Sequence, residues 1–419
     1  MSVGRLCVSL CVRHGVKGWG ENMLRRTLQI VALCCGALGL TIPAQAQFRF
    51  STEALFMDKS NGSSQPMVSG PDSLSNEANS GIQVGSRFTF GATYDAYDIE
   101  MIGSQIQGWK GSSSGTLSNL LIFDDTANNP VVVPVPPANT LAFTNSLRDA
   151  AILAGVEDLE SERLQAGARY FINGSSRLQD YQVNIGTNPT CNPWRMSVGW
   201  RQMRLNENSG FGITGVFDAL DTATGAVSGD PGNIENDALG NAALIAAGYS
   251  LRSGAGDGYD AFDVPGGVAP DDLSIYYAST TQNILNGVQV SGGYQLFPEG
   301  ALSVEIFGRT GIFQNKTRGN VGEYLIGSVN DDSSYQRTFS QTRNGVAFGG
   351  TLGLKAALPV TDYISLTAGY EAMYIANLAL AAGQVGGLSN NPLGERFYTI
   401  DNGDTLIIHG ATVGMQVTW

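Results

Sequence analysis

Histidine and cysteine are scarce in this chain. It has two histidines, of which only His409 lies beyond residue 46, and four of its five cysteines fall within those first 46 residues, leaving Cys191. A Ser-His-Asp or Cys-His mechanism would have to use His409. This histidine lies within an apolar strand, which favours a structural position over a catalytic one. Too few histidines and cysteines remain for a His-based zinc site or a thiolate cluster. No glycine-rich phosphate loop follows a strand and opens a helix. We therefore predict a protein that is not an enzyme and has no metal and no cofactor.

Long apolar runs are also missing, because no segment approaches the about 20 residues that a membrane helix needs. The one short run spans residues 30–40, follows Arg25 and Arg26, and is followed by the sequence Ala-Gln-Ala ending at Ala46. A basic N-terminal region, a short apolar core and a cleavage site of small residues are typical of a secretory signal peptide. We expect residues 1–46 to be this signal, with Met23 as the true start, and residues 47–419 to form one domain.

Charged residues make up only 15% of the chain, and the net charge is -13. Residues 1–46 hold five basic residues against one acidic residue, so the remainder is more acidic than the whole. A strongly acidic exported protein is a poor partner for nucleic acid, which we therefore exclude.

The C-terminal residues show the clearest strand pattern. From Ala411 onward, apolar residues occupy every second position up to Trp419, and Thr412, Gly414, Gln416 and Thr418 alternate with them. A period of two with one apolar side indicates a β-strand. Ending on an aromatic residue is typical of the closing strand of an outer-membrane barrel, where Trp419 would lie in the interfacial girdle.

Several other segments alternate over about ten or more residues, near the length that a tilted membrane strand requires. The clearest are residues 82–93, 97–110, 194–205, 281–297, 301–313, 343–358 and 363–376. We further expect residues 164–185 to give two strands and residues 210–220 to return from the strand at 194–205. Short turns alternate with long segments such as residues 314–342 and 377–404. The sequence thus predicts an all-β, transmembrane antiparallel β-barrel of about twelve strands, closed by the C-terminal strand, with ten and fourteen as the neighbouring even counts.

Two long segments interrupt the strand pattern, at residues 112–160 and 221–272. The first is rich in proline near residues 130–137, and the second is rich in glycine, aspartate and asparagine. We expect both to be loops, the first with a possible short helix at residues 146–156. The acidic spacing in the second could suit Ca²⁺ but does not match an EF-hand, and a solvated loop is the favoured interpretation.

Charged residues fall on the polar side of strand after strand. In a barrel that side lines the lumen, since a charge on the lipid face is costly. The predicted pore-lining residues are Arg87, Asp98, Glu100, Arg195, Arg201, Glu305, Arg309, Arg343, Lys355 and Glu371. They could filter solutes in an open pore, or they could form salt bridges that brace a closed wall. Outward-facing aromatics predicted for the membrane interface are Trp419, Trp194 and Trp200.

A further signal lies in four stretches: residues 194–207, residues 281–283 leading into 287–290, residues 368–374 with Leu380 and Ala381, and residues 409–415 before the terminal aromatic. These stretches resemble a planctomycete-type family of outer-membrane beta-barrel porins. The similarity covers residues 48–110 and 164–419, while the insertions at 112–160 and 221–272 have no counterpart. The resemblance implies an outer-membrane barrel and says little about what passes through it.

We expect a bacterial outer-membrane barrel that acts as a passive diffusion channel for small polar solutes. Its partners would be the lipid bilayer and the outer-membrane barrel assembly machinery, which we expect to engage the C-terminal strand. One alternative is a structural or adhesive surface barrel with a closed lumen that acts through its acidic loops. Another is a soluble secreted β protein. The solute and the oligomeric state are left open by the sequence.

Overall fold

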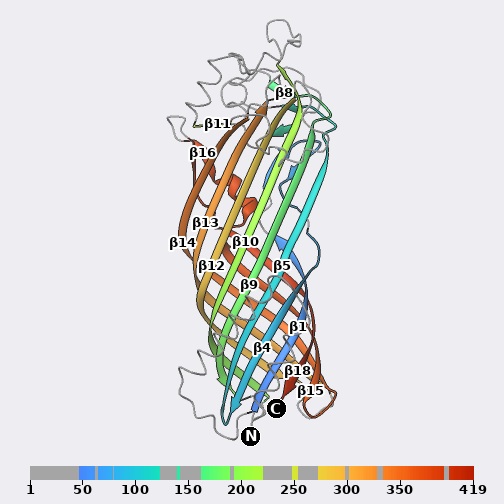
Figure 1. The fold of residues 1–419 in the computed structure, drawn as a ribbon, viewed down its shortest axis with the longest axis vertical. Coiled ribbons are helices and arrows are strands. Elements are labelled where there is room, and N and C mark those ends of the chain that lie inside the picture. Colours follow the sequence, from blue (N-terminus) through green and yellow to red (C-terminus); the bar gives the residue numbers. More distant parts are fainter. Residues whose placement is uncertain are drawn as a thin grey trace, which may run out of the picture.

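The protein is a closed antiparallel β-barrel of ten long strands, seen in a computed structural model (Figure 1). The structure describes residues 47–61, 65–78, 80–122, 139–141, 162–188, 193–219, 248–252, 272–297, 302–327, 334–390 and 396–419. The expected signal peptide lies outside these residues, as do Cys191, most of the loop at 112–160, including its proline-rich run and its possible helix, and most of the loop at 221–272.

The barrel strands pair in the order β12-β13-β14-β15-β18-β1-β4-β5-β9-β10, and β10 pairs with β12 to close the ring. Their bounds are β1 (Gln47–Asn61), β4 (Gln83–Tyr94), β5 (Tyr97–Thr116), β9 (Arg169–Thr187), β10 (Trp194–Ala219), β12 (Asp272–Gln295), β13 (Ser303–Gly327), β14 (Ser334–Pro359), β15 (Ile364–Leu378) and β18 (Asp404–Thr418). The first and last strands are neighbours, as expected of a barrel closed by its C-terminal strand.

Short elements lie among the connections at one end. They are β2 (Pro66–Ser69), β3 (Leu74–Ser75), β6 (Leu121–Ile122), β7 (Asn139–Leu141), β8 (Glu162–Leu164), β11 (Ser250–Arg252), the 3₁₀ helix η2 (Ala381–Gly387), β16 (Leu388–Asn390) and β17 (Arg396–Tyr398). We call this the loop end. The opposite end, the terminus end, holds the start of β1, Trp419 and the connection between β4 and β5 (Figure 1).

The predicted count of twelve strands is wrong, and two places account for the difference. Residues 169–187 form one strand, β9, where two strands were expected. Residues 194–219 form one strand, β10, where a turn and a returning strand were expected. The expected long segment at 314–342 is also mostly strand, because β13 runs to Gly327 and β14 begins at Ser334. In each case the polarity of the alternating sides changes along the strand, and this change looks like a strand end in the sequence.

The exterior of the barrel is apolar toward the terminus end and polar toward the loop end. On β10, Trp194, Met196, Val198 and Trp200 point outward and are exposed, whereas the outward positions from Gln202 to Asn208 are polar. Strands β10, β12, β13 and β14 have 24 to 26 residues, but crossing a bilayer takes only about 9 to 11. The barrel therefore spans a membrane with its terminus half and extends beyond it with its loop half.

Two apolar clusters fill the interior. One, at mid-height, includes Leu55, Met203, Leu285 and Phe313. The other lies toward the loop end and includes Phe211, Tyr277 and residues of the connection between β15 and β18. No helix in the described part of the chain is both long enough and apolar enough to cross a membrane.

Candidate functional site in the barrel lumen

A cavity of about 690 Å³ occupies the lumen at the terminus end. Five basic side chains line it, from β1, β4, β10, β13 and β14, together with the carboxylates Glu53, Glu100 and Glu305. The basic residues are Arg49, Arg87, Arg195, Arg309 and Lys355. Mixed charge of this kind allows both solute binding and internal ion pairing, so the partner of each group decides what the cavity can do.

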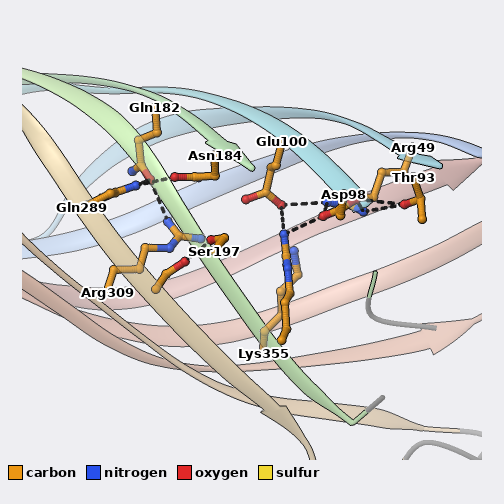
Figure 2. Close-up of polar contacts among 12 residues, drawn as sticks. Arg49, Thr93, Asp98, Glu100, Gln182, Asn184, Ser197, Gln289, Arg309 and Lys355 are labelled. Atoms are coloured by element: carbon orange, nitrogen blue, oxygen red, sulfur yellow. Dashed lines mark hydrogen bonds and ion pairs between the residues drawn. The ribbon is translucent and has the colours of Figure 1, made fainter. Parts of the chain in front are cut away.

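Two arginines share two acids on one side of this cavity (Figure 2). Arg49 Nη1 lies 2.6 Å from Asp98 Oδ1, and Arg49 Nη2 lies 3.1 Å from Glu100 Oε2. Arg195 Nη2 donates to both acids as well, at 3.0 Å to Asp98 and 2.9 Å to Glu100. The two arginines come from β1 and β10, on either side of β5, which carries both acids. The four side chains therefore brace neighbouring parts of the wall.

Other ion pairs cross larger gaps in the ring. Lys355 of β14 lies 2.6 Å from Glu53 of β1, and Arg87 of β4 pairs with Glu53 and with Glu371 of β15. In the strand order, β14 and β1 are separated by two strands, and so are β15 and β4. These contacts tie separate arcs of the wall together and place charged groups across the bore.

Arg309 differs from the other cavity arginines because no carboxylate of the described residues lies within ion-pair distance. Its Nη1 donates to Gln182 Oε1 at 3.3 Å, and its guanidinium lies 5.2 Å from the centroid of the Phe307 ring. Gln289 Nε2 donates to the same Gln182 oxygen and to Asn184 Oδ1 (Figure 2). The cavity thus ends inward on an amide network, with one arginine facing it.

An apolar layer lies across the lumen beyond these amides. The wall side chains in this layer are almost entirely buried, with Met203, Leu205, Leu285 and Leu406 at 0% exposure. The members contributed by the wall are Leu55, Met57, Ile106, Trp109, Leu178, Met203, Leu205, Leu285, Phe313, Ala347, Ile375, Leu406 and Ile408. They come from nine of the ten strands, all except β4, so the layer extends around most of the ring.

Phe313 lies flat in this layer because glycines surround it. A Cβ at Gly311 would lie 2.7 Å from its ring, and one at Gly287 or Gly349 would lie 2.8 or 3.2 Å away. Three strands therefore carry glycine at the positions where this aromatic ring packs. The lumen-side space that these glycines leave is filled by the Phe313 ring.

The connection between β15 and β18 folds into the barrel above the apolar layer (Figure 1). Asn283 of β12 both donates to Ala379 O at 2.7 Å and accepts from Ala379 N at 3.1 Å. Asp404 accepts from Leu380 N at 2.9 Å, and Glu207 accepts from Ala381 N at 3.2 Å. These wall groups replace the water that the backbone of the segment would otherwise need.

Gln384 lies at the centre of this inserted segment and is completely buried. Its amide donates to Leu380 O and Asp401 O, and its oxygen accepts from Tyr398 Oη at 2.7 Å and Asp401 N at 3.2 Å. Burial, and next the charge of Asp401, raise the pKa of the Tyr398 phenol. The loop half therefore has a satisfied polar core in addition to its apolar cluster.

Two further sets of ion pairs lie above the layer. Lys59 of β1 pairs with Glu207 of β10, and both side chains are nearly buried. Glu323 of β13 pairs with Arg337 and Arg396, each at 2.7 Å. Within the described residues, no group of three or more histidines, cysteines, aspartates or glutamates could hold a metal ion.

All ten predicted pore-lining residues lie on interior-facing positions of their strands. Seven of them form ion pairs. Six of the seven are described above, and the seventh is Arg201, whose Nε lies 2.9 Å from Asp180 Oδ1. Arg309 faces the amide network, and Glu305 lines the cavity with Lys355 as its register neighbour on β14. Arg343 lies apart from the others, toward the loop end, where it donates to Ile400 O at 2.9 Å. That they line an open conduit stays a prediction.

Reasoning from the sequence missed several interior charges. Three of them lie on one side of β1: Arg49, Glu53 and Lys59. They are four and six residues apart, and even spacings place strand residues on the same face, so the alternation could have identified them as interior charges. Glu323 and Arg337 were missed because their segment was expected to be a loop. No sequence signal shows that Lys59 meets Glu207, since 148 residues separate them.

The three predicted interfacial aromatics all point outward. Trp194 and Trp419 are 62% and 57% exposed at the terminus end, where Trp419 stacks on Phe48 and Trp194 packs on Tyr294. Trp200 lies at the other edge of the apolar belt. His409 also faces outward, with its Nδ1 2.8 Å from Tyr370 Oη, in an ordinary wall position.

Comparison with known proteins assigns no family to this chain. No family model matches the chain, and no curated protein matches its sequence. Among solved structures, it is similar to the outer-membrane protease OmpT from Escherichia coli, with 10% identity, 90% of this chain and 98% of that chain covered, and a TM-score of 0.36. It is also similar to the translocator domain of the autotransporter NalP from Neisseria meningitidis (10% identity, 95% and 96% covered, TM-score 0.32). An anion-selective porin from Comamonas acidovorans shares 9% identity over 90% of this chain and 99% of that chain, with a TM-score of 0.18.

The descriptions name a protease, a translocator domain and a porin. At these identities and TM-scores the three structures carry no argument about this chain. The resemblance to the porin family noted in the sequence stays a prediction. The chain is an all-β, closed antiparallel barrel of ten strands with an apolar exterior belt, which is the architecture of outer-membrane β-barrel proteins.

Proposed function

We propose that this protein is a non-conducting barrel of the bacterial outer membrane with a structural or surface-display role. The observation that carries the proposal is the apolar layer at mid-height. Side chains of nine wall strands meet there with almost no exposed surface, which favours a lumen without a continuous water-filled path. A polar solute would have to give up its hydration to pass.

The number of strands supports the same conclusion. A barrel of about eight strands is just wide enough for its own side chains to fill, whereas water-filled porin channels use about 16 to 18. Ten strands lie near the narrow limit. The interior charges also favour a closed wall, since all except Arg309 and Glu305 among those lining the cavity have a partner of opposite charge. We therefore assign them a bracing role in preference to a filtering role.

The orientation follows from the unequal ends. Outer-membrane barrels have short periplasmic turns and longer extracellular loops, so the loop end faces the outside of the cell. The loop half then projects beyond the membrane as a folded platform. Any adhesive or display role would belong to the long connections at this end, and assembly would use β18, which closes the barrel against β1.

A diffusion channel is the second candidate, and the cavity of about 690 Å³ at the terminus end is the observation in its favour. This cavity would become part of a continuous channel only if the lumen beyond it opened. Withdrawal of the inserted segment would remove Leu380 from the layer but would leave the wall side chains, including Leu378 at the end of β15, in place.

Single-channel conductance in a planar bilayer tests the proposal. The refolded protein should insert fully and pass no stable current. A variant in which residues 379–403 are replaced by a short glycine-serine turn should also stay closed, because the wall provides the layer. Stable ohmic steps in the unmodified protein, with an ion selectivity that changes in Arg195→Gln and Arg309→Gln, would instead establish the diffusion channel.

The soluble alternative has a separate test. The apolar belt on the terminus half would be a large exposed patch in water. The refolded protein should therefore aggregate on removal of detergent, and a monodisperse monomer in plain buffer would contradict membrane insertion.

A further inference from the structure

The exterior of the barrel changes in steps from the membrane belt toward the loop end. Trp200, Val288 and Ile312 are register neighbours on β10, β12 and β13, and all three are exposed. Two residues farther along, the neighbours are the amides Gln202, Asn286 and Gln314, of which the first two are hydrogen-bonded at 2.8 Å. This amide row marks the edge of the apolar belt.

Basic side chains begin one row beyond the amides. Arg204 and Lys316 share a row, with Ile284 between them on β12. In the next row Arg318 pairs in register with Gln282, and Arg177 of β9 with Asn206 of β10. Lys110 of β5 lies one row farther, opposite Ser175 of β9. These five residues, which we call the basic band, are Lys110, Arg177, Arg204, Lys316 and Arg318.

The band differs from the interior in how its charges are balanced. Inside, Arg49, Lys59 and Arg87 all face carboxylates. On the exterior of β5, β9, β10, β12 and β13, no acidic residue occurs among the positions whose side chains the structure describes. Four members of the band, Lys110, Arg204, Lys316 and Arg318, are exposed and form no ion pair with any described carboxylate. In a chain with a net charge of -13, such a concentration of basic side chains indicates an anionic partner.

The position of the band limits what that partner can be. Four residues along a tilted strand separate Trp200 from Arg204, which corresponds to about 10 Å above the apolar edge. The polar headgroups begin at this edge, and long basic side chains can bend toward them. The anionic groups fixed at this height on a membrane are lipid phosphates.

The residues between the cations favour a headgroup that also carries hydroxyls. Gln282 Nε2 donates to Asn206 Oδ1 at 2.8 Å, Asn208 Nδ2 donates to Ser175 Oγ at 3.2 Å, and Asn320 Nδ2 donates to Thr280 Oγ1 at 3.1 Å. Amide and hydroxyl groups of this kind can both donate and accept hydrogen bonds, as sugar hydroxyls require. Arg204 and Lys316 are two strands apart, about 10 Å, and the two rows are about 7 Å apart, so one headgroup with more than one phosphate can reach several cations.

We propose that the basic band is a binding site for the phosphorylated headgroup of a glycolipid in the membrane leaflet on the loop side. The site rests on the barrel spanning a membrane but does not depend on whether the lumen conducts. It would fix the depth of the barrel in the leaflet and hold a glycolipid against β9, β10, β12 and β13.

Lipid binding to the detergent-purified protein, measured by native mass spectrometry, tests the proposal. The probes are bisphosphorylated lipid A and the same lipid after removal of its phosphates. Each positive charge near a membrane surface contributes about fivefold to anionic lipid affinity. The variant Arg204→Gln/Lys316→Gln/Arg318→Gln should therefore bind the phosphorylated lipid roughly 100-fold more weakly, taking about fivefold for each charge. Binding by the unmodified protein should also weaken as salt is raised.

The charge-retaining variant Arg204→Lys/Lys316→Arg/Arg318→Lys is the matched control and should keep most of the affinity. Equal binding of the two lipids by the unmodified protein would overturn the proposal without the use of any variant. So would full binding by the neutral triple variant, or displacement of the lipid by inorganic phosphate alone. The conductance of the protein is measured separately, so failure here leaves the proposed closed lumen untouched.

Discussion

The two halves of the barrel have opposite distributions of polarity on the same ten strands. In the terminus half of β10, Arg195 and Arg201 face the interior while Trp194 and Val198 face outward. Farther along the same strand Phe211 faces the interior, and the outward positions from Gln202 to Asn208 are polar. The terminus half is organised for lipid outside, and the loop half resembles a water-soluble β protein with its own core. The surrounding solvent therefore decides which side of a strand is apolar.

This comparison also gives a physical reason for the proposed closure of the lumen. The apolar layer lies where the charged interior of one half gives way to the apolar interior of the other. Wherever the strands extend into water, a narrow barrel has to bury apolar side chains somewhere, and the bore is the available place. Closure is thus a consequence of a barrel that continues beyond the membrane with only ten strands.

The largest expected effect comes from the Lys59–Glu207 pair inside the barrel. Lys59→Met should lower the free energy of unfolding by about 3 to 5 kcal/mol, because it leaves the Glu207 carboxylate buried without its cation. Denaturant unfolding in detergent measures the change. Lys316→Met removes an exposed, unpaired lysine of the same barrel and should change stability by no more than about 0.5 kcal/mol. Equal effects of the two substitutions would remove the distinction between interior and exterior charges.

A second test places the same charge on the outside of each half. Val290 and Thr280 both face outward on β12, ten residues apart, and both are exposed. Val290→Arg should cost about 2 to 4 kcal/mol because it puts the charge in the lipid belt. Thr280→Arg should cost less than about 0.5 kcal/mol because it remains in water. The same assay measures both, and a large cost at Thr280 would show that the belt extends farther than the structure indicates.

The smallest effect concerns the polar core of the loop half. Since burial and the nearby Asp401 raise the pKa of Tyr398, the folded state favours the protonated phenol. Its contribution to stability is full below the ordinary tyrosine value of 10.0 and is lost as the pH rises from there toward the folded pKa. Tyr398→Phe should cost about 1 kcal/mol at neutral pH through the lost hydrogen bond and should flatten the alkaline fall. An equally steep fall in the variant would show that other groups cause it.

Much of the membrane-facing structure was predictable from local alternation. The strand at 411–419, the turn between β4 and β5 and the interior positions of residues such as Arg195 and Lys355 follow from a period of two and from the cost of a charge in lipid. The strand count was not predictable in the same way, because β9 and β10 change their polar side partway along and each looked like two elements.

The sequence alone determined that these strands form a barrel with charged residues turned inward, because side-chain parity is a local property of an extended chain. Only the tertiary structure decided whether that interior is open. The pairing of Lys59 with Glu207, the packing of Phe313 against glycines of other strands and the insertion of η2 all join residues far apart in the chain. Contacts of this kind depend on the width and closure of the whole ring, and no local pattern records them.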